Sequence, residues 1–246
     1  MFSIFKKKPS SVTDINWLGV DIHNHLLPGI DDGSKTVMES IEYISKMMNL
    51  GFEKLICTPH IFKELYPNTA ETINPALQLV KDALSAAGLK IEISSAAEYM
   101  VDENFKISGD LLCLPSKNIL IEMSYLNETP NIEKTIFDLQ IKGYSVILAH
   151  PERYNFYHSD LRRLKRYKDM GVLLQLNLLS VAGYYGKEVK KAAEYIIESK
   201  LYDVAGTDLH HDRHLSALSS VVESGILYKK LGSYPFLNRQ LFGVKS

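Results

Sequence analysis

The chain is poor in cysteine and contains no long apolar run. Its 246 residues include only two cysteines, Cys57 and Cys113, which excludes a disulfide-stabilised scaffold and is typical of a reducing compartment. No segment reaches the roughly 18 consecutive apolar residues of a membrane-spanning helix. The formal net charge of −1 lacks the basic excess of nucleic-acid-binding proteins. We therefore expect a cytoplasmic protein that neither spans a membrane nor binds nucleic acid.

Several catalytic fingerprints are missing as well. The sequence contains no GxGxxG, GxxxxGK[ST] or GxSxG motif, which argues against dinucleotide binding, nucleoside-triphosphate binding and serine-hydrolase chemistry. A cysteine-dependent tyrosine phosphatase needs an arginine six residues after its nucleophilic cysteine, but Lys63 and Ile119 occupy these positions. Any hydrolytic chemistry must therefore come from another set of residues.

What the sequence does contain is a regular alternation of apolar, strand-length segments with segments of helical period. The alternation predicts a parallel sheet with right-handed crossovers, closed into a barrel or, as the alternative, left open and doubly wound. After an N-terminal extension over 1–16, we expect a single domain over 17–246. The predicted strands are 17–23, 54–60, 91–99, 118–124, 144–153, 172–177 and 203–210, and the predicted helices are about 35–50, 70–87, 131–142, 160–170, 188–199 and one beginning near His214.

Histidines and acidic residues lie where these predicted strands end. The carboxyl-terminal ends of barrel strands carry the reactive groups of α/β barrels, so these side chains should meet at one mouth. A carboxylate inside an apolar strand, such as Glu122, is costly to bury unless it is paired or bound to a metal. The pattern therefore predicts a metal centre. Its nine candidate ligands are His23, His25, Asp31, His60, Glu98, Glu122, His150, Asp208 and His210, with Asp32 and Gly33 expected to form only a turn.

Imidazole and carboxylate ligands without thiolate favour manganese, iron or zinc over calcium or copper(I). Nine ligands are too many for one ion and enough for a cluster. Three divalent ions carry more positive charge than the four carboxylates of Asp31, Glu98, Glu122 and Asp208 can neutralise. The centre should therefore attract an anion such as a phosphate ester. Bound ions also lower the pKa of water towards about 7.

Two arginines near the predicted mouth are candidates for binding that phosphate. Arg153 follows His150 by three residues, and Arg213 follows the last predicted strand. A guanidinium group forms bidentate hydrogen bonds with phosphate oxygens. Release of the leaving group can require a proton from a general acid, and the need is mild when the leaving group has a low pKa. His211 and Asp212 could supply such a proton, and this choice stays open.

With these residues in place, the sequence resembles the polymerase and histidinol phosphatase (PHP) superfamily. More narrowly, it is similar to the bacterial PHP-type protein tyrosine phosphatases encoded with capsule and exopolysaccharide genes. The segments that carry the resemblance are DIHNHLLPGIDDGS (21–34), ICTPH (56–60), AAEYM (96–100), LIEMS (120–124), ILAHPERY (147–154), LLQLN (173–177) and GTDLHH (206–211).

The resemblance implies a distorted (β/α)7 TIM-like barrel with three divalent ions, often manganese, and a metal-bridging hydroxide as the nucleophile. It also implies a protein substrate, the phosphotyrosine-containing tail of a bacterial tyrosine autokinase that controls capsule or exopolysaccharide synthesis. In the implied scheme the first ion is held by His23, His25, Glu98 and Asp208, the second by Glu98, Glu122 and His150, and the third by Asp31, His60 and His210.

Other functions remain open at this stage. The same metal scaffold could serve a histidinol-phosphate or other small-molecule phosphomonoesterase. A metal-dependent amidohydrolase also begins with HxH, but Asp31, His60 and His210 would then lack a purpose. A binding module that recognises phosphotyrosine without hydrolysing it is a third alternative. Nothing in the sequence specifies an oligomeric state.

Overall fold

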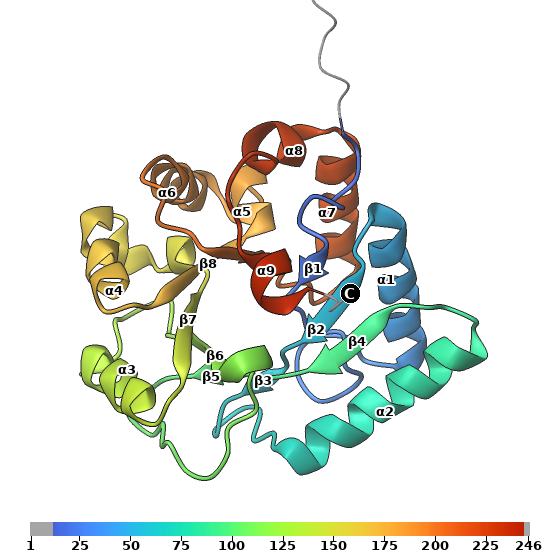
Figure 1. Cartoon of the computed structure of the whole chain (residues 1–246), viewed down its shortest axis with the longest axis horizontal. Helices are drawn as coiled ribbons and strands as arrows, with labels where there is room; N and C mark the ends of the chain where they lie inside the picture. The colour runs from blue at the N-terminus through green and yellow to red at the C-terminus, as the bar shows by residue number, and fades with distance from the viewer. Residues whose placement is uncertain (1–11, 244–246) are drawn as a thin grey trace, which may run out of the picture.

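The computed structural model describes residues 12–243 and contains short parallel strands with helices packed around them (Figure 1). Its strands are β1 (Val20–Asp21), β2 (Lys54–Cys57), β3 (His60–Ile61), β4 (Glu92–Ser95), β5 (Glu98–Met100), β6 (Asn118–Glu122), β7 (Ser145–Ala149), β8 (Leu173–Asn177) and β9 (Val204–Gly206). Its α-helices are α1 (Val37–Leu50), α2 (Ala70–Ala86), α3 (Ile132–Ile141), α4 (Lys165–Asp169), α5 (Leu178–Ala182), α6 (Lys187–Glu198), α7 (Asp212–Glu223), α8 (Ile226–Leu231) and α9 (Asn238–Phe242).

All strand pairs are parallel, and the strands form two sheets with the orders β1-β2-β4 and β3-β5-β6-β7-β8-β9. The two sheets are consecutive parts of one barrel, because β2 continues into β3 and β4 continues into β5 after breaks of two residues each. Backbone hydrogen bonds cross both breaks: Ala96 N donates to Cys57 O at 2.8 Å, and Glu98 N donates to Pro59 O at 3.1 Å. The expected distorted (β/α)7 barrel is confirmed, with two of its strands interrupted.

The barrel closes where β1 meets β9. Because β1 is only two residues long, few ladder bonds are available, and the segments that follow the two strands supply the contacts. Asp208 N donates to His23 O at 2.7 Å, and His25 N donates to Leu209 O at 2.9 Å. The same bonds bring the two histidines beside Asp208.

The opposite end of this junction is closed by α9. Asn238 is buried, and its side chain accepts from Ala205 N at 2.9 Å and donates to Val20 O at 2.9 Å and to Ala205 O at 2.7 Å. The amide thus replaces missing ladder bonds between β1 and β9. Figure 1 shows α9 lying directly beside β1.

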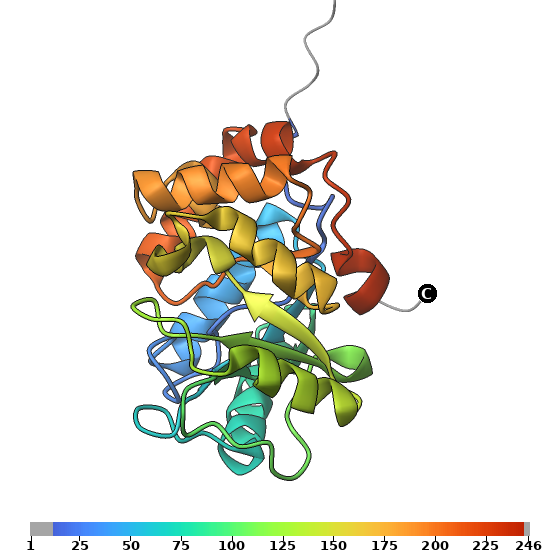
Figure 2. The same ribbon diagram turned by 90° about the vertical axis from the view of Figure 1, so that its left-hand side faces the viewer.

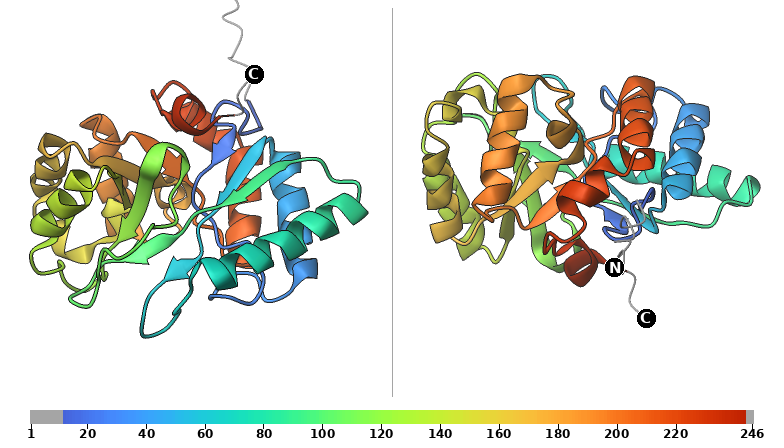
Figure 3. Two further views of the ribbon diagram at one scale, coloured as in Figure 1. Left: turned by 60° about the horizontal axis from the view of Figure 1, so that its bottom comes forward. Right: turned by 90° about the horizontal axis from the view of Figure 1, so that it is seen from above.

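The outer helices fall into two groups. Helices α1, α2 and α7 lie next to one another on one side (Figure 3), and α3, α4 and α6 lie side by side on the other (Figure 2). Helix α1 begins as the sequence predicts, with Thr36 Oγ1 accepting from Glu39 N at 3.2 Å, and ends at Gly51 with φ of 106°. The predicted helix at 160–170 is instead a 3-10 turn (Leu161–Leu164) followed by the short α4, and α5, α8 and α9 were not anticipated.

The basic residues around α4 are mostly paired with acids. A paired cation attracts a distant acidic partner less strongly, so this surface does not act as an extended basic patch. The ion pairs are Arg162–Asp160, Arg163–Glu128, Arg166–Glu128 and Lys168–Asp203.

Part of the expected N-terminal extension packs against the barrel. Residues 1–11 lie outside the described part of the chain, but Ile15 is fully buried and its N–H donates to Leu50 O at 2.8 Å. Within residues 12–243, no helix has the length and apolar character needed to cross a membrane.

We expect Asn238→Ala to lower the free energy of unfolding by about 2–4 kcal/mol, because it leaves buried backbone groups of β1 and β9 without partners. Urea denaturation followed by circular dichroism measures the change. Asn127→Ala, at an exposed position, is the matched control and should change stability little. Equal stability of the two variants would contradict a closing role for Asn238.

Candidate metal centre

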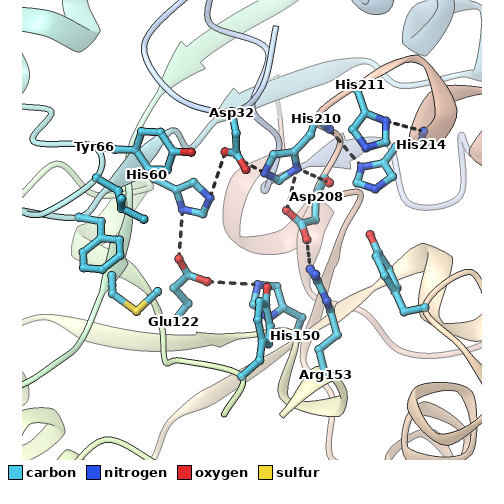
Figure 4. A pocket seen from close by; sticks show the side chains of 15 residues that line it. Asp32, His60, Tyr66, Glu122, His150, Arg153, Asp208, His210, His211 and His214 are labelled. Atoms are coloured by element: carbon cyan, nitrogen blue, oxygen red, sulfur yellow. Dashed lines mark hydrogen bonds and ion pairs between the residues drawn. The ribbon is translucent and has the colours of Figure 1, made fainter. Parts of the chain in front are cut away.

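A cavity of about 360 Å³ lies at the carboxyl-terminal ends of the strands (Figure 4). Four overlapping groups of side chains around it have ligand atoms within 4.8 Å of one another. Eight of the nine predicted residues belong to these groups, which are His23–His25–Glu98, His23–His150–Asp208, His60–Glu98–Glu122 and His25–Asp32–His60–His210.

The first group lies at the junction of β1 and β9. His23 Nε2 is 3.1 Å from Glu98 Oε2, and His25 Nε2 is 3.5 Å from the same oxygen. Asp208 Oδ1 lies 3.4 Å from His23 Nε2 and 3.5 Å from His25 Nε2. Four potential ligand atoms therefore face one point from three different strand ends.

Glu98 also belongs to a second set of contacts, with Glu122 and two further histidines. His150 Nε2 is 3.2 Å from Glu98 Oε1 and 3.9 Å from Glu122 Oε2. His60 Nδ1 lies 3.1 Å from Glu98 Oε2 and 3.1 Å from Glu122 Oε1. The Glu98 carboxylate is thus shared between the two sets.

Asp32, and not Asp31, faces the remaining histidines. Asp32 Oδ1 is 3.5 Å from His60 Nε2 and 3.6 Å from His210 Nε2, as Figure 4 shows. His60 therefore has one ring nitrogen toward Asp32 and the other toward the two glutamates. The expectation that Asp32 serves only as a turn residue is wrong.

The expectation that Asp31 faces this group is also wrong, since hydrogen bonds elsewhere occupy both of its carboxylate oxygens. Oδ2 accepts from His25 Nδ1 at 2.8 Å and from His60 N at 3.1 Å, and Oδ1 accepts from Gly33 N at 2.9 Å. Asp31 therefore orients the His25 ring from behind. Two consecutive aspartates in a loop give no sequence signal for which one points inward.

The electrostatics of the cavity fit divalent cations. Burial would raise the pKa of Glu98, but the neighbouring imidazoles, His23 foremost, hold it well below its ordinary value. Burial would likewise raise the pKa of Asp208, but the neighbouring charges, His23 foremost, hold it well below its ordinary value. Among the residues that the structure describes, Glu98 Oε2 and His60 Nδ1 are buried without a well-formed hydrogen bond. Charged oxygens and unsatisfied imidazole nitrogens in one buried space match the donor set of manganese, iron or zinc.

Gln175 orients the His23 ring, also binds the backbone of His150, and was not singled out from the sequence. Its Oε1 accepts from His23 Nδ1 at 3.0 Å and from His150 N at 3.3 Å. A proton on Nδ1 leaves His23 Nε2 free as a ligand atom. The available signal was a polar residue inside the otherwise apolar segment LLQLN.

A second series of buried hydrogen bonds holds the side chain of Asp208 in place. Glu152 accepts from Asn177 N at 2.9 Å and from the Tyr202 hydroxyl at 2.8 Å. Asn177 Nδ2 in turn donates to Asp208 Oδ2 at 3.0 Å. Because Oδ2 is held from this side, Oδ1 remains directed to the histidines.

Arg153 lines the cavity, as the sequence predicts. Its guanidinium carbon lies 4.6 Å from the centre of the Tyr125 ring and 4.3 Å from that of Tyr185, and Nη1 donates to Asp208 Oδ2. Burial works against the charge of Arg153, but Tyr125 and Asp208 raise its pKa, so the group stays cationic. The stacking fixes the plane of the guanidinium.

Arg213 and the cysteines lie apart from this cavity. Arg213 is exposed in the first turn of α7, and the cavity is lined from that helix by His214 instead. Burial raises the pKa of the Cys57 thiol, and it raises the pKa of Cys113 to about 11. Neither thiol is prepared to act as a thiolate nucleophile.

Comparison with known proteins agrees with this geometry. The family model described as "Capsular polysaccharide synthesis, CpsB/CapC" matches residues 19–233. Tyrosine-protein phosphatase YwqE of Bacillus subtilis is 29% identical over 196 residues, which cover 78% of this chain and 77% of YwqE. The putative tyrosine-protein phosphatase CapC of Staphylococcus aureus is 28% identical over 243 residues, covering 90% of this chain and 92% of CapC.

A solved structure gives the same result at the level of the fold. A crystal structure from a study of YwqE of Bacillus subtilis and CpsB of Streptococcus pneumoniae, described as unique metal-dependent tyrosine phosphatases, superimposes with a TM-score of 0.76 and 27% identity. The match covers 90% of this chain and 90% of that one. Since the family model also spans most of the sequence, the chain belongs to the CpsB/CapC family of capsular polysaccharide synthesis proteins.

Proposed function

We propose that this protein is a metal-dependent protein tyrosine phosphatase that acts in capsular polysaccharide synthesis. The observation that carries the proposal is the gathering of buried carboxylates and imidazoles around one cavity that also contains the cationic Arg153. The named activities of YwqE and CapC support it. As the physiological substrate we propose the phosphotyrosine-containing tail of a bacterial tyrosine autokinase, and two free cysteines suit a cytoplasmic location.

We further propose that the cavity holds three divalent ions, manganese in the first place, with iron or zinc also suited to the donor set. When bound, such ions provide a hydroxide nucleophile at neutral pH and neutralise ester oxygens. The residues proposed to hold them form three sets, namely His23, His25, Glu98 and Asp208; Glu98, Glu122 and His150; and Asp32, His60 and His210, with the two-oxygen carboxylate of Glu98 shared between the first two.

The chain's own contribution is to bind and orient the phosphate. Arg153 carries a fixed positive charge at the cavity wall, and its N–H groups beyond the one that Asp208 accepts are available to phosphate oxygens. The rings of Tyr125 and Tyr185 hold it in one orientation, so little reorganisation is needed as charge develops. A tyrosine phenolate with a pKa near 10 leaves without strong assistance from an acid.

The test of the proposed activity is hydrolysis of a phosphotyrosyl peptide, the matching phosphoseryl peptide and histidinol phosphate in the presence of manganese. We expect the phosphotyrosyl peptide to react fastest, and we expect a chelator to abolish the reaction until manganese is restored. Phosphate release and metal analysis of the protein are the measurements. Faster hydrolysis of histidinol phosphate, or full activity after chelation, would overturn the proposal.

Asp32 and Asp31 should respond differently to the same isosteric change. We expect Asp32→Asn to reduce the number of ions bound per chain, because it removes a proposed ligand. Asp31→Asn should keep that number but weaken metal affinity by about 10- to 100-fold, since it only orients His25. Metal titration with mass-spectrometric counting checks both, and Asp169→Asn at an exposed position is the control. An unchanged metal count in Asp32→Asn would contradict the assignment.

The two arginines should also differ. We expect Arg153→Ala to lower kcat/KM for a phosphotyrosyl peptide by about 100-fold, the usual cost of removing a donor that stabilises transition-state charge. The loss of kcat/KM in Arg213→Ala should be about tenfold smaller than the loss in Arg153→Ala, because Arg213 is exposed and lies outside the cavity lining. Steady-state kinetics with metal-loaded enzyme measures both. Comparable losses in the two variants would show that Arg213 reaches the substrate.

A further inference from the structure

A second cavity, of about 500 Å³, lies beside the metal cavity. Phe62 and Met100 line both cavities, so the two are separated only by side chains that they share. We call the second cavity the side groove. Its walls come from the segment after β3 and from the segment that follows β5.

The side groove has an apolar floor and a rim of mixed charge. Ile61, Phe105 and Leu112 are half-buried and pack against the core, and each still lines the groove. On the rim, Lys63 and Lys106 are outnumbered by Glu71, Asp102 and Asp110. Such a lining suits an apolar side chain with an extended main chain and does not suit a second phosphate.

The ridge between the two cavities is a hydrogen-bonded turn that exposes an apolar side chain. Phe62 N donates to Tyr66 O at 2.9 Å and Tyr66 N to Phe62 O at 2.7 Å, which closes a tight turn. Leu65 in this turn is 65% exposed and lines the metal cavity. Across the groove, Asn104 Nδ2 donates to Glu64 Oε1 at 3.0 Å and ties the two walls together.

We propose that the side groove binds an aliphatic or aromatic residue that flanks the phosphotyrosine in the protein substrate. The inference rests on the proposed function, because a phosphotyrosine held at the metal centre must carry its main chain out over the cavity rim. An extended peptide advances by only about 3.3 Å per residue, and Phe62 and Met100 line both cavities, so the proposal places the residues next to the phosphotyrosine at this shared wall.

The test uses metal-loaded full-length protein and three kinds of substrate: p-nitrophenyl phosphate, a phosphotyrosyl peptide with alanine at the flanking positions, and the same peptide with leucine or phenylalanine there. We expect kcat/KM to be about tenfold higher for the apolar-flanked peptide than for the alanine-flanked one, mainly through KM, because a buried apolar side chain is worth about that much.

Ser108→Trp should remove this preference and leave hydrolysis of p-nitrophenyl phosphate unchanged, since Ser108 is exposed and lines only the side groove. Phe105→Ala should weaken the preference by removing part of the floor. Ser199→Trp, exposed at the end of α6, is the matched control and should behave as wild type. The proposal is overturned if wild type shows no preference or if Ser108→Trp retains it.

A binding measurement separates this inference from the proposed activity. Fluorescence polarisation of the two labelled phosphotyrosyl peptides should give the same tenfold difference in Kd, and Ser108→Trp should abolish it. Loss of hydrolysis of every phosphotyrosyl substrate, with groove-dependent binding retained, would contradict the phosphatase activity and support the groove. Hydrolysis without any dependence on the flanking residue would contradict the groove alone.

Discussion

The site depends on keeping the carboxylate of Glu98 charged inside the barrel. Glu98 is fully buried, and removing such a charge from water costs several kcal/mol unless other groups compensate. The imidazoles of His23, His150 and His25 lie 3.1–3.5 Å from its two oxygens and, His23 foremost, hold its pKa well below the ordinary value. The interruption between β4 and β5 and the bond from Glu98 N to Pro59 O direct this residue to the barrel mouth. Several imidazoles share the Glu98 carboxylate. Removing one of these imidazoles therefore leaves the buried negative charge of Glu98 less well compensated.

A surrounding layer of uncharged or internally paired groups determines how the cluster is oriented. Gln175 fixes His23 and Asp31 fixes His25, while Glu152 acts on Asp208 through Asn177. These contacts occupy Nδ1 of both histidines and Oδ2 of Asp208, so that Nε2 of the histidines and Oδ1 of Asp208 face one another. The inward-facing atoms are therefore left for cations and phosphate, and the geometry is preorganised before either binds.

The two ends of the barrel have different roles. At one end, the side chain of Asn238 in α9 joins the short β1 to β9 through hydrogen bonds, and this contact stabilises the fold. At the other end, the loops that follow the strands carry the titratable cluster, the stacked Arg153 and the exposed Leu65. This division is the general one for α/β barrels, in which chemistry is placed at the carboxyl-terminal ends of the strands.

The sequence by itself determined the parallel α/β class, the alternation of its main elements and eight of the residues gathered around the cavity, because strand-end positions and apolar periodicity are local properties, while closure into a barrel was implied by the family resemblance. Only the tertiary structure decided between Asp31 and Asp32, stacked Arg153 between two tyrosines, placed Gln175 behind two histidines and left Arg213 outside the cavity lining. These outcomes depend on the direction of loop backbones and on contacts between residues far apart in the chain. Neighbouring residues in a loop can point to opposite sides, and only packing against the rest of the barrel fixes which one faces inward.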